Sequence, residues 1–382
     1  IADTLTDGAT STINAGNGTL TLAPLTASNT IDVCNVDAAN GCTVAPPGTA
    51  TEYDLASLGI TAGNLQIGQG SQTGDIVMGT AVLGAGQTYA VSLQNGGTGS
   101  ITVAGEFSGN GLAVNSGSGG IALNGNVTTT GDNVVFNDDV TLGVAAPTVN
   151  TGAGGGDVDF QGTINGGSAL TVAAGTGSVS VGDVGTTTPL SSLDISGASV
   201  DLGGNITTGG DVTISGATNL SASFVIDSAA GDGAVNISAG SLTNSADENL
   251  TINSGAVAVT LADVSVNTLS VTTGGAAAVG AVTNTGDIDI SADSITASGA
   301  MSGDNISLAA ASAAVALPQV TAANNLSVQA GGNISATGSI QAGGDASFVS
   351  TGAITLDQAN STYGSLSLVG ASAVVDEEDA TE

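Results

Sequence analysis

Apolar and polar residues alternate over short stretches along almost the whole chain, and each stretch is bounded by Gly, Asn, Asp or Ser. Examples are residues 100–105 (SITVAG), 211–216 (DVTISG) and 287–292 (DIDISA). Alternation with a period of two between turn residues predicts short strands with one buried face. The sequence has no convincing apolar stripe with the helical period of 3.6 residues. We therefore expect an all-β protein.

The spacing of the predicted strands indicates a coil. Their first apolar residues are separated by 19, 38, 19, 19, 18, 20, 20 and 20 positions, and the gap of 38 is interpreted as two turns of 19. These residues are Leu193, Val212, Leu250, Leu269, Ile288, Ile306, Leu326, Ala346 and Leu366. A period of about 19–20 residues predicts a right-handed parallel β-helix, a β-solenoid, of roughly 18 to 20 turns with strands about 4.8 Å apart. A left-handed hexapeptide solenoid is the alternative, but it requires a strict multiple of six.

The position before each of these apolar residues is polar in every case. We predict that these side chains form a ladder at one corner of the coil, where Asx and Ser side chains bond nearby backbone N–H groups. Its predicted Asx members are Asp211, Asn249, Asp287, Asn305, Asn325 and Asp345. No two aspartates fall on adjacent predicted turns, as expected because like charges on neighbouring strands are destabilising.

Charge excludes one class of partner. The 382 residues include 33 acidic residues and no Lys, Arg or His, so the formal net charge is −33. Nucleic acids are bound through Lys and Arg, so we predict no nucleic-acid partner.

Hydrophobic residues make up 41% of the chain, which predicts folding rather than disorder. No apolar stretch approaches the roughly 20 residues of a membrane-spanning helix. No signal peptide is visible, and we interpret the sequence as a processed or excerpted part of a longer protein.

Two cysteines, Cys34 and Cys42, flank a short loop that contains a good turn former at residues 40–41. We predict that they form a structural disulfide in an oxidising compartment. Two thiols without a nearby His cannot complete a tetrahedral metal site. The predicted organisation is a region of amino-terminal coils with the bridged loop over 1–57, β-helix repeats over 58–373, and an acidic tail or linker over 374–382.

Candidate catalytic chemistry is sparse, and we predict that the protein is not an enzyme. The nearest approach to paired carboxylates is Asp138 with Asp139, or Asp157 with Asp159. Only eight aromatic residues occur, which leaves no platform for sugars, and triad chemistry is impossible without His. We predict no cofactor, with calcium as the one candidate, because carboxylates without basic partners are hard oxygen ligands. Residues 151–160 superficially resemble a calcium β-roll repeat, but its pattern fails there and does not recur.

Residues 149–216 resemble the repeats of filamentous-haemagglutinin-like giant exoproteins, the two-partner-secreted adhesins of Gram-negative bacteria. Residues 20–33 and 58–79 also resemble a unit common in such proteins. The resemblance lies in the composition and in the regular spacing of the predicted strands. It implies an extracellular or cell-surface right-handed β-helix within a long polypeptide.

Two hypotheses for function follow. The first is a structural extracellular β-solenoid, a segment of a surface filament or biofilm-matrix fibre that self-associates end to end. The second is an adhesin stalk that presents a receptor- or glycan-binding loop to a host or neighbouring cell, with residues 34–57 as the best candidate loop. A calcium-binding protein of the surface-layer type is a less favoured third hypothesis.

Overall fold

The computed structural model describes residues 12–34, 50–55, 59–83, 87–143 and 145–375. These residues form short parallel strands stacked in about 16 turns, a β-solenoid. The one helical element in the described ranges is a single 3-10 turn, η1 (Ala229–Gly231). None of the described helical structure is long and apolar enough to cross a membrane. The chain divides into two compact units, Ile1–Ser199 and Val200–Glu382, and each is described separately.

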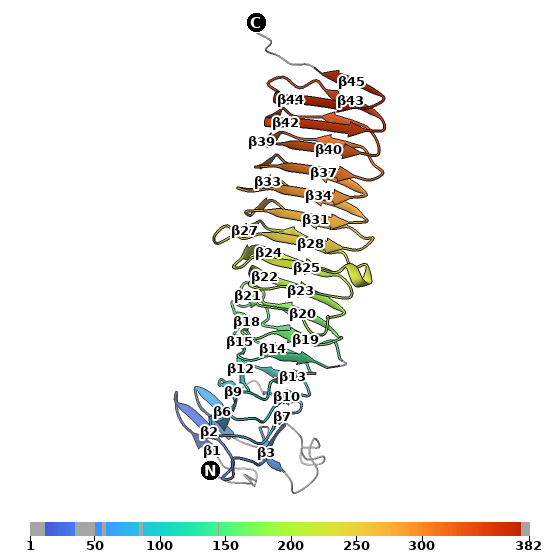
Figure 1. The fold of residues 1–382 in the computed structure, drawn as a ribbon. Helices are drawn as coiled ribbons and strands as arrows, with labels where there is room; N and C mark the ends of the chain where they lie inside the picture. The colour runs from blue at the N-terminus through green and yellow to red at the C-terminus, as the bar shows by residue number, and fades with distance from the viewer. Residues whose placement is uncertain (1–11, 35–49, 56–58, 84–86, 144, 376–382) are drawn as a thin grey trace. The chain divides into compact units, whose positions relative to one another are not determined.

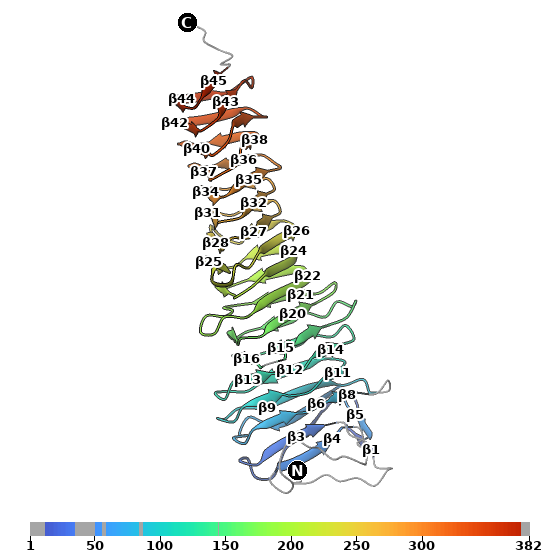
Figure 2. The same cartoon turned by 90° about the vertical axis from the view of Figure 1, so that its right-hand side faces the viewer.

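Unit 1 (Ile1–Ser199) has three sides of stacked strands, seen in Figures 1 and 2. Side I contains β2 (Thr19–Leu22), β6 (Asn64–Gln69), β9 (Ala90–Asn95), β12 (Leu112–Asn115), β15 (Val134–Phe136), β18 (Val158–Phe160) and β21 (Ser178–Val181). Side II contains β4 (Ala50–Asp54), β3 (Thr30–Cys34), β7 (Ile76–Met78), β10 (Ile101–Val103), β13 (Ile121–Leu123), β16 (Val140–Leu142) and β19 (Ile164–Asn165). Side III contains β8 (Ala81–Val82), β11 (Phe107–Gly109), β14 (Val127–Thr129), β17 (Thr148–Asn150), β20 (Ala169–Ala173) and the start of β22 (Ser192–Leu202). A separate pair joins β1 (Thr12–Asn14) to β5 (Gly59–Thr61).

Unit 2 (Val200–Glu382) has the same plan, with sides A, B and C. Side A contains β23 (Ile206–Thr207), β25 (Phe224–Asp227), β28 (Leu250–Ser254), β31 (Leu269–Thr273), β34 (Ile288–Ala292), β37 (Ile306–Ala310), β40 (Leu326–Ala330) and the later parts of β42 (Ile340–Ser350) and β44 (Thr362–Val369). Side B contains the start of β24 (Val212–Leu220), β26 (Val235–Ala239), β29 (Val259–Leu261), β32 (Ala276–Val279), β35 (Ser294–Ala297), β38 (Val315–Leu317), β41 (Ile334–Ala336), β43 (Ala353–Leu356) and β45 (Ser372–Val375). Side C contains the end of β24, then β27 (Leu242–Asn244), β30 (Val264–Ser265), β33 (Val282–Thr283), β36 (Met301–Gly303), β39 (Val320–Ala322) and the starts of β42 and β44.

The core of each unit consists of columns of inward side chains. On side A, Leu250, Leu269, Ile288, Ile306 and Leu326 are each at most 1% exposed and pair in register from turn to turn. Burying one such side chain stabilises the fold by about 1.5–3 kcal/mol. The alternating pattern therefore specifies both the strand and the face that it buries, and the predicted all-β parallel solenoid is confirmed.

The length of a turn varies more than the sequence spacing suggested. From Leu250 to Leu366 successive partners lie 18 to 20 positions apart, as predicted. In unit 1, Val134 pairs with Val158, and the adjacent bond between Asn133 and Asp157 spans the same 24 positions. In unit 2, Phe224 pairs with Leu250, and the adjacent bond between Ser223 and Asn249 spans the same 26 positions. Longer corner loops use the additional residues, which is why the chain forms about 16 turns and not 18 to 20.

One part of the predicted column is wrong. Val212 pairs with Val235 on side B, whereas Leu250 belongs to side A with Phe224 before it. The gap of 38 between Val212 and Leu250 therefore joins two different sides and is not two full turns. The cause is the long turn that contains η1, which spans 26 positions where the sequence spacing predicted 19.

The predicted boundaries at 57/58 and 373/374 stay predictions. Strand β45 extends to Val375, two residues into the predicted acidic tail, and 376–382 lie outside the described residues. Cys34 is the last residue of β3, and Cys42 also lies outside the described residues, so the disulfide stays a prediction. Strand β3 pairs with β7 along one edge and with β4 along its other edge. The order of these strands in the sheet therefore differs from their order in the sequence in this part of unit 1.

Candidate functional site

Polar side chains form a ladder at the corner before side A of unit 2. Each oxygen accepts a hydrogen bond from the equivalent residue one turn later. The contacts are Asn249 N–H to Ser223 Oγ (2.9 Å), Thr268 N–H to Asn249 Oδ1 (3.2 Å), Asn305 N–H to Asp287 Oδ1 (3.1 Å), Asn325 N–H to Asn305 Oδ1 (3.3 Å), Asp345 N–H to Asn325 Oδ1 (3.0 Å) and Ser365 Oγ–H to Asp345 Oδ1 (2.6 Å). The structure thus brings together five of the six predicted Asx residues, Asn249, Asp287, Asn305, Asn325 and Asp345.

Asp211 is not part of this ladder, and its predicted place there is wrong. It precedes Val212 on side B, because the long turn at η1 shifts the register. Its Oδ1 instead accepts the N–H of Ala234 at 2.9 Å, which is the same kind of contact at another corner.

The same contact recurs at corners of both units. In most of these pairs an Asp or Asn on the earlier turn accepts a backbone N–H from the later turn. Further pairs are Asp75 with Ser100 (2.8 Å), Asn133 with Asp157 (2.9 Å), Asp139 with Thr163 (2.8 Å), Asp263 with Ala281 (2.8 Å) and Asn333 with Ala353 (2.9 Å). Since the chain has no basic side chain, these N–H groups replace the salt-bridge partners that carboxylates often have in folded proteins.

A second set of polar residues was not predicted from the sequence. Buried hydroxyls at the inner corner after side A bond carbonyl groups of the bend one turn earlier. Ser254 Oγ donates to Gly233 O at 2.9 Å, Thr273 Oγ1 to Val257 O at 2.6 Å, and Ser350 Oγ to Gly332 O at 2.6 Å. The signal that could have found them is position, since each hydroxyl stands four residues after an inward apolar residue, where alternation places a buried side chain.

Replacement of Asn325 tests the polar ladder at the corner before side A, which we call the outer ladder. Asn325→Ala removes the acceptor for Asp345 N–H and the Nδ2 donor to Asn305, which lies 3.2 Å from its acceptor. The free energy of unfolding should fall by about 0.5–1.5 kcal/mol. Asn325→Asp keeps the acceptor but places carboxylates on adjacent turns, so its cost should be larger in low salt than in high salt. Urea denaturation measures both, with the exposed neighbour Asn324→Ala as control. Equal effects at 324 and 325 would contradict a role for the ladder.

The carboxylate pairs considered for catalysis accept hydrogen bonds from neighbouring backbone and side-chain groups. Asp138 Oδ2 accepts Ser116 N–H at 2.7 Å, and Asp139 accepts both N–H and Oγ1–H of Thr163. Asp159 accepts Gln161 Nε2–H at 2.9 Å. Hydrogen bonds from the backbone and then the side chain of Ser178 lower the pKa of Asp157 below its usual 3.8. A general acid at neutral pH requires a raised pKa, so the shift at Asp157 has the opposite direction.

The lowered pKa of Asp157 predicts a pH dependence. Because the folded-state pKa lies below the unfolded value, its contribution to stability is present above pH 3.8 and is lost as pH falls through the folded pKa. We expect Asp157→Asn, which keeps an acceptor and removes the titration, to be less stable than the wild type at pH 7. The difference in unfolding free energy should shrink below pH 3.8. A difference that is constant from pH 7 to pH 2 would contradict this assignment.

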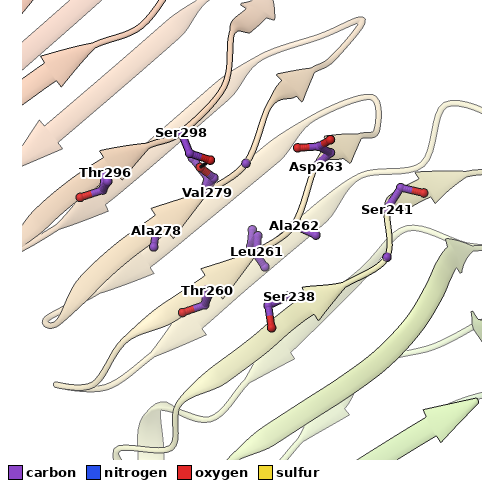
Figure 3. Close-up of a pocket in the computed structure, with 12 residues that line it drawn as sticks. Ser238, Ser241, Thr260, Leu261, Ala262, Asp263, Ala278, Val279, Thr296 and Ser298 are labelled. Carbon is purple, nitrogen blue, oxygen red and sulfur yellow. Dashed lines mark hydrogen bonds between the residues drawn. The ribbon is translucent and has the colours of Figure 1, made fainter.

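The described surface has open grooves. The groove in Figure 3 runs across side B, with a volume of about 430 Å³. Thr260, Ala278 and Thr296 lie there on three successive strands, with the carboxylate of Asp263 at the edge. A groove of about 390 Å³ in unit 1 includes Asp138 and Asp139. Among the described residues, no three or more His, Cys, Asp or Glu are grouped so that they could hold a metal ion.

Comparison with known protein families finds a match in unit 2. A family described as repeats of unknown function (DUF5649) matches residues 303–369, which span β36 to β44 in unit 2. These residues belong to the part of the chain with the most regular turns. Searches of the curated proteins and of the solved structures find no match. The comparisons therefore show a repeat segment over residues 303–369, and the structure shows that its turns stack as a β-solenoid.

Proposed function

We propose that this chain is a structural segment of an extracellular filament or biofilm-matrix fibre, in which β-solenoid units associate end to end. The observation that carries the proposal is the single register of side A. From Leu250 to Leu366 each strand pairs residue by residue with the one before it. Each turn therefore offers the next turn the same strand edge and the same apolar columns.

Stacking of this kind propagates without a specialised partner. A strand with unpaired N–H and C=O groups recruits another strand unless it is covered. On three successive turns, Asp287, Asn305 and Asn325 each supply an acceptor for the N–H of the following turn. A function that depends on length and stacking needs neither catalysis nor a resident cofactor, and we propose none.

Strand β44 provides a test of this proposal. Its inward residues Leu366 and Leu368 are partly exposed, whereas their partners one turn earlier, Ala346 and Phe348, are at most 1% exposed. If units stack at this face, Leu368→Asp should block association and leave the solenoid folded. Ser367→Asp adds the same charge to the same strand, but on the outward face, and should associate like the wild type.

Sedimentation velocity and electron microscopy of the purified chain, in low and high salt with and without calcium, measure the outcome. Fibres that are lost only in Leu368→Asp support end-to-end stacking. A monomer under every condition would contradict it and would favour the adhesin-stalk hypothesis. In that case binding to cells should depend on residues 34–57.

A further inference from the structure

The outer ladder of unit 2 uses charged and neutral acceptors in the same geometry. Asp287 accepts Asn305 N–H through a carboxylate oxygen at 3.1 Å, and Asn325 accepts Asp345 N–H through an amide oxygen at 3.0 Å. Before side B, Asn333 accepts Ala353 N–H at 2.9 Å, and before side C, Asp263 accepts Ala281 N–H at 2.8 Å. Charged and neutral oxygen acceptors therefore occupy these corners with similar distances.

A protonated aspartate still has a carbonyl oxygen that can accept one hydrogen bond. Protonation of Asp287 or Asp345 would leave an acceptor like the amide oxygen of Asn305 or Asn325 on the neighbouring turns. The change weakens each bond, since a charge-assisted hydrogen bond is roughly twice as strong as a neutral one. It does not remove the bond.

The titratable side chains near this corner are all carboxyls. Asp304 lies in the corner turn beside the ladder, and its N–H bonds Gly286 O. Asp289 lies on the outward face of β34, between Ser270 and Ser307 on the adjacent strands. The chain contains no Lys, Arg or His, so no basic side chain loses a carboxylate partner on acidification and no His gains a charge.

Relief of repulsion between the carboxylates opposes the usual effect of acid. Acid denaturation arises mainly from protonation of paired carboxylates and from charging of buried His. In this chain acid instead brings the net charge from −33 toward zero, without a large positive charge at lower pH. Repulsion between the carboxylates destabilises the folded chain and also keeps separate molecules apart. Both effects weaken as the net charge falls. Asp157 opposes this trend, because its lowered pKa means that it loses stability in acid, but it is one of 33 acidic residues.

We propose that the solenoid is an acid-triggered assembly element, which keeps its fold when its carboxyls are protonated and associates because its charge is removed. This proposal goes beyond the filament function, because it also states that single molecules stay folded in acid. That property can be measured without any filament. It predicts a transition in association between pH 5 and pH 3 without unfolding.

The experiment uses the full chain at pH 7, 5 and 3. Circular dichroism on a dilute sample should show the β spectrum at every pH, with a cooperative melt at pH 3 near or above the melting temperature at pH 7. Light scattering on a concentrated sample should rise several-fold at pH 3 and return on neutralisation. Loss of the β spectrum at pH 3 would overturn the proposal, and so would a folded chain whose scattering does not rise.

Two double variants test the role of the ladder in keeping the fold in acid. Asp287→Asn with Asp345→Asn keeps both acceptors and should melt within a few degrees of the wild type at pH 7 and at pH 3. Asp287→Ala with Asp345→Ala removes both acceptors and should melt lower at both values. If the Asn variant is as unstable as the Ala variant, the corner needs charge and the proposal is wrong. Fibres at pH 7 test the filament function separately, because retention of the fold in acid does not depend on them.

Discussion

Replacing Val328 with Asp is expected to lower the free energy of unfolding of unit 2 by about 3–5 kcal/mol, because the new carboxylate would be buried without a partner. Val328 is 0% exposed on side A, between Leu308 and Phe348 on the adjacent turns. No basic side chain exists in the chain to compensate the charge. Because the inward column is continuous, the defect should disturb the turns on both sides.

The matched control is Ser327→Asp, one residue earlier on the same strand. Ser327 points outward between Ser307 and Ser347, so no charged residue lies directly opposite an added carboxylate, and Asp345 lies two residues away along β42. Its effect should stay within about 0.5 kcal/mol, as for ordinary surface changes. Urea denaturation followed by circular dichroism compares the two. Similar losses at 327 and 328 would mean that the inward and outward faces of β40 are assigned incorrectly.

The second large effect is expected from Gly125→Ala. Gly125 lies at a corner of unit 1, where the added Cβ would meet the backbone carbonyl oxygen of Gly105 one turn earlier at a separation that real Cβ atoms do not show. A backbone atom cannot rotate away as a flexible side chain can, so the turns must separate locally. The expected cost is about 1–3 kcal/mol, the usual range for overpacking.

Gly167→Ala is the control for this substitution. Gly167 is exposed, and no heavy atom lies within 4 Å of the position that an added Cβ would take. Its backbone φ lies outside the left-handed range. Alanine should therefore be neutral there or stabilise the chain by about 0.4–1 kcal/mol through the unfolded state. Thermal melts of both variants measure the difference, and equal melting temperatures would contradict the close stacking of Gly105 and Gly125.

The sequence predicted the solenoid well where the turns are uniform. Between Leu250 and Leu366 the alternation fixes the inward residues, and a period of 18 to 20 identifies the turns. The ladder followed from the same register, because the residue before each inward apolar residue occupies a corner. Five of its six predicted Asx members lie there for this reason.

The errors also have a physical cause. Corner loops vary in length while the strands keep their register, so a count along the sequence cannot distinguish a full turn from a step between two sides. This is how Val212 on side B was placed in the column of Leu250 on side A. The stacked glycines Gly105 and Gly125 are similarly invisible in the sequence, because most glycines in the chain simply mark bends.

The most direct test of the filament account is cryo-electron microscopy of the assembled chain, with fibre diffraction from the same material. End-to-end stacking predicts thin fibres with a repeat of about 4.8 Å along the fibre axis, since parallel strands stack at that spacing from one turn to the next. Particles that remain single under all salt, calcium and pH conditions would contradict it. Fibres whose spacing of about 4.8 Å runs across the axis would contradict it as well, because the units would then be joined through their sides and not through their turns.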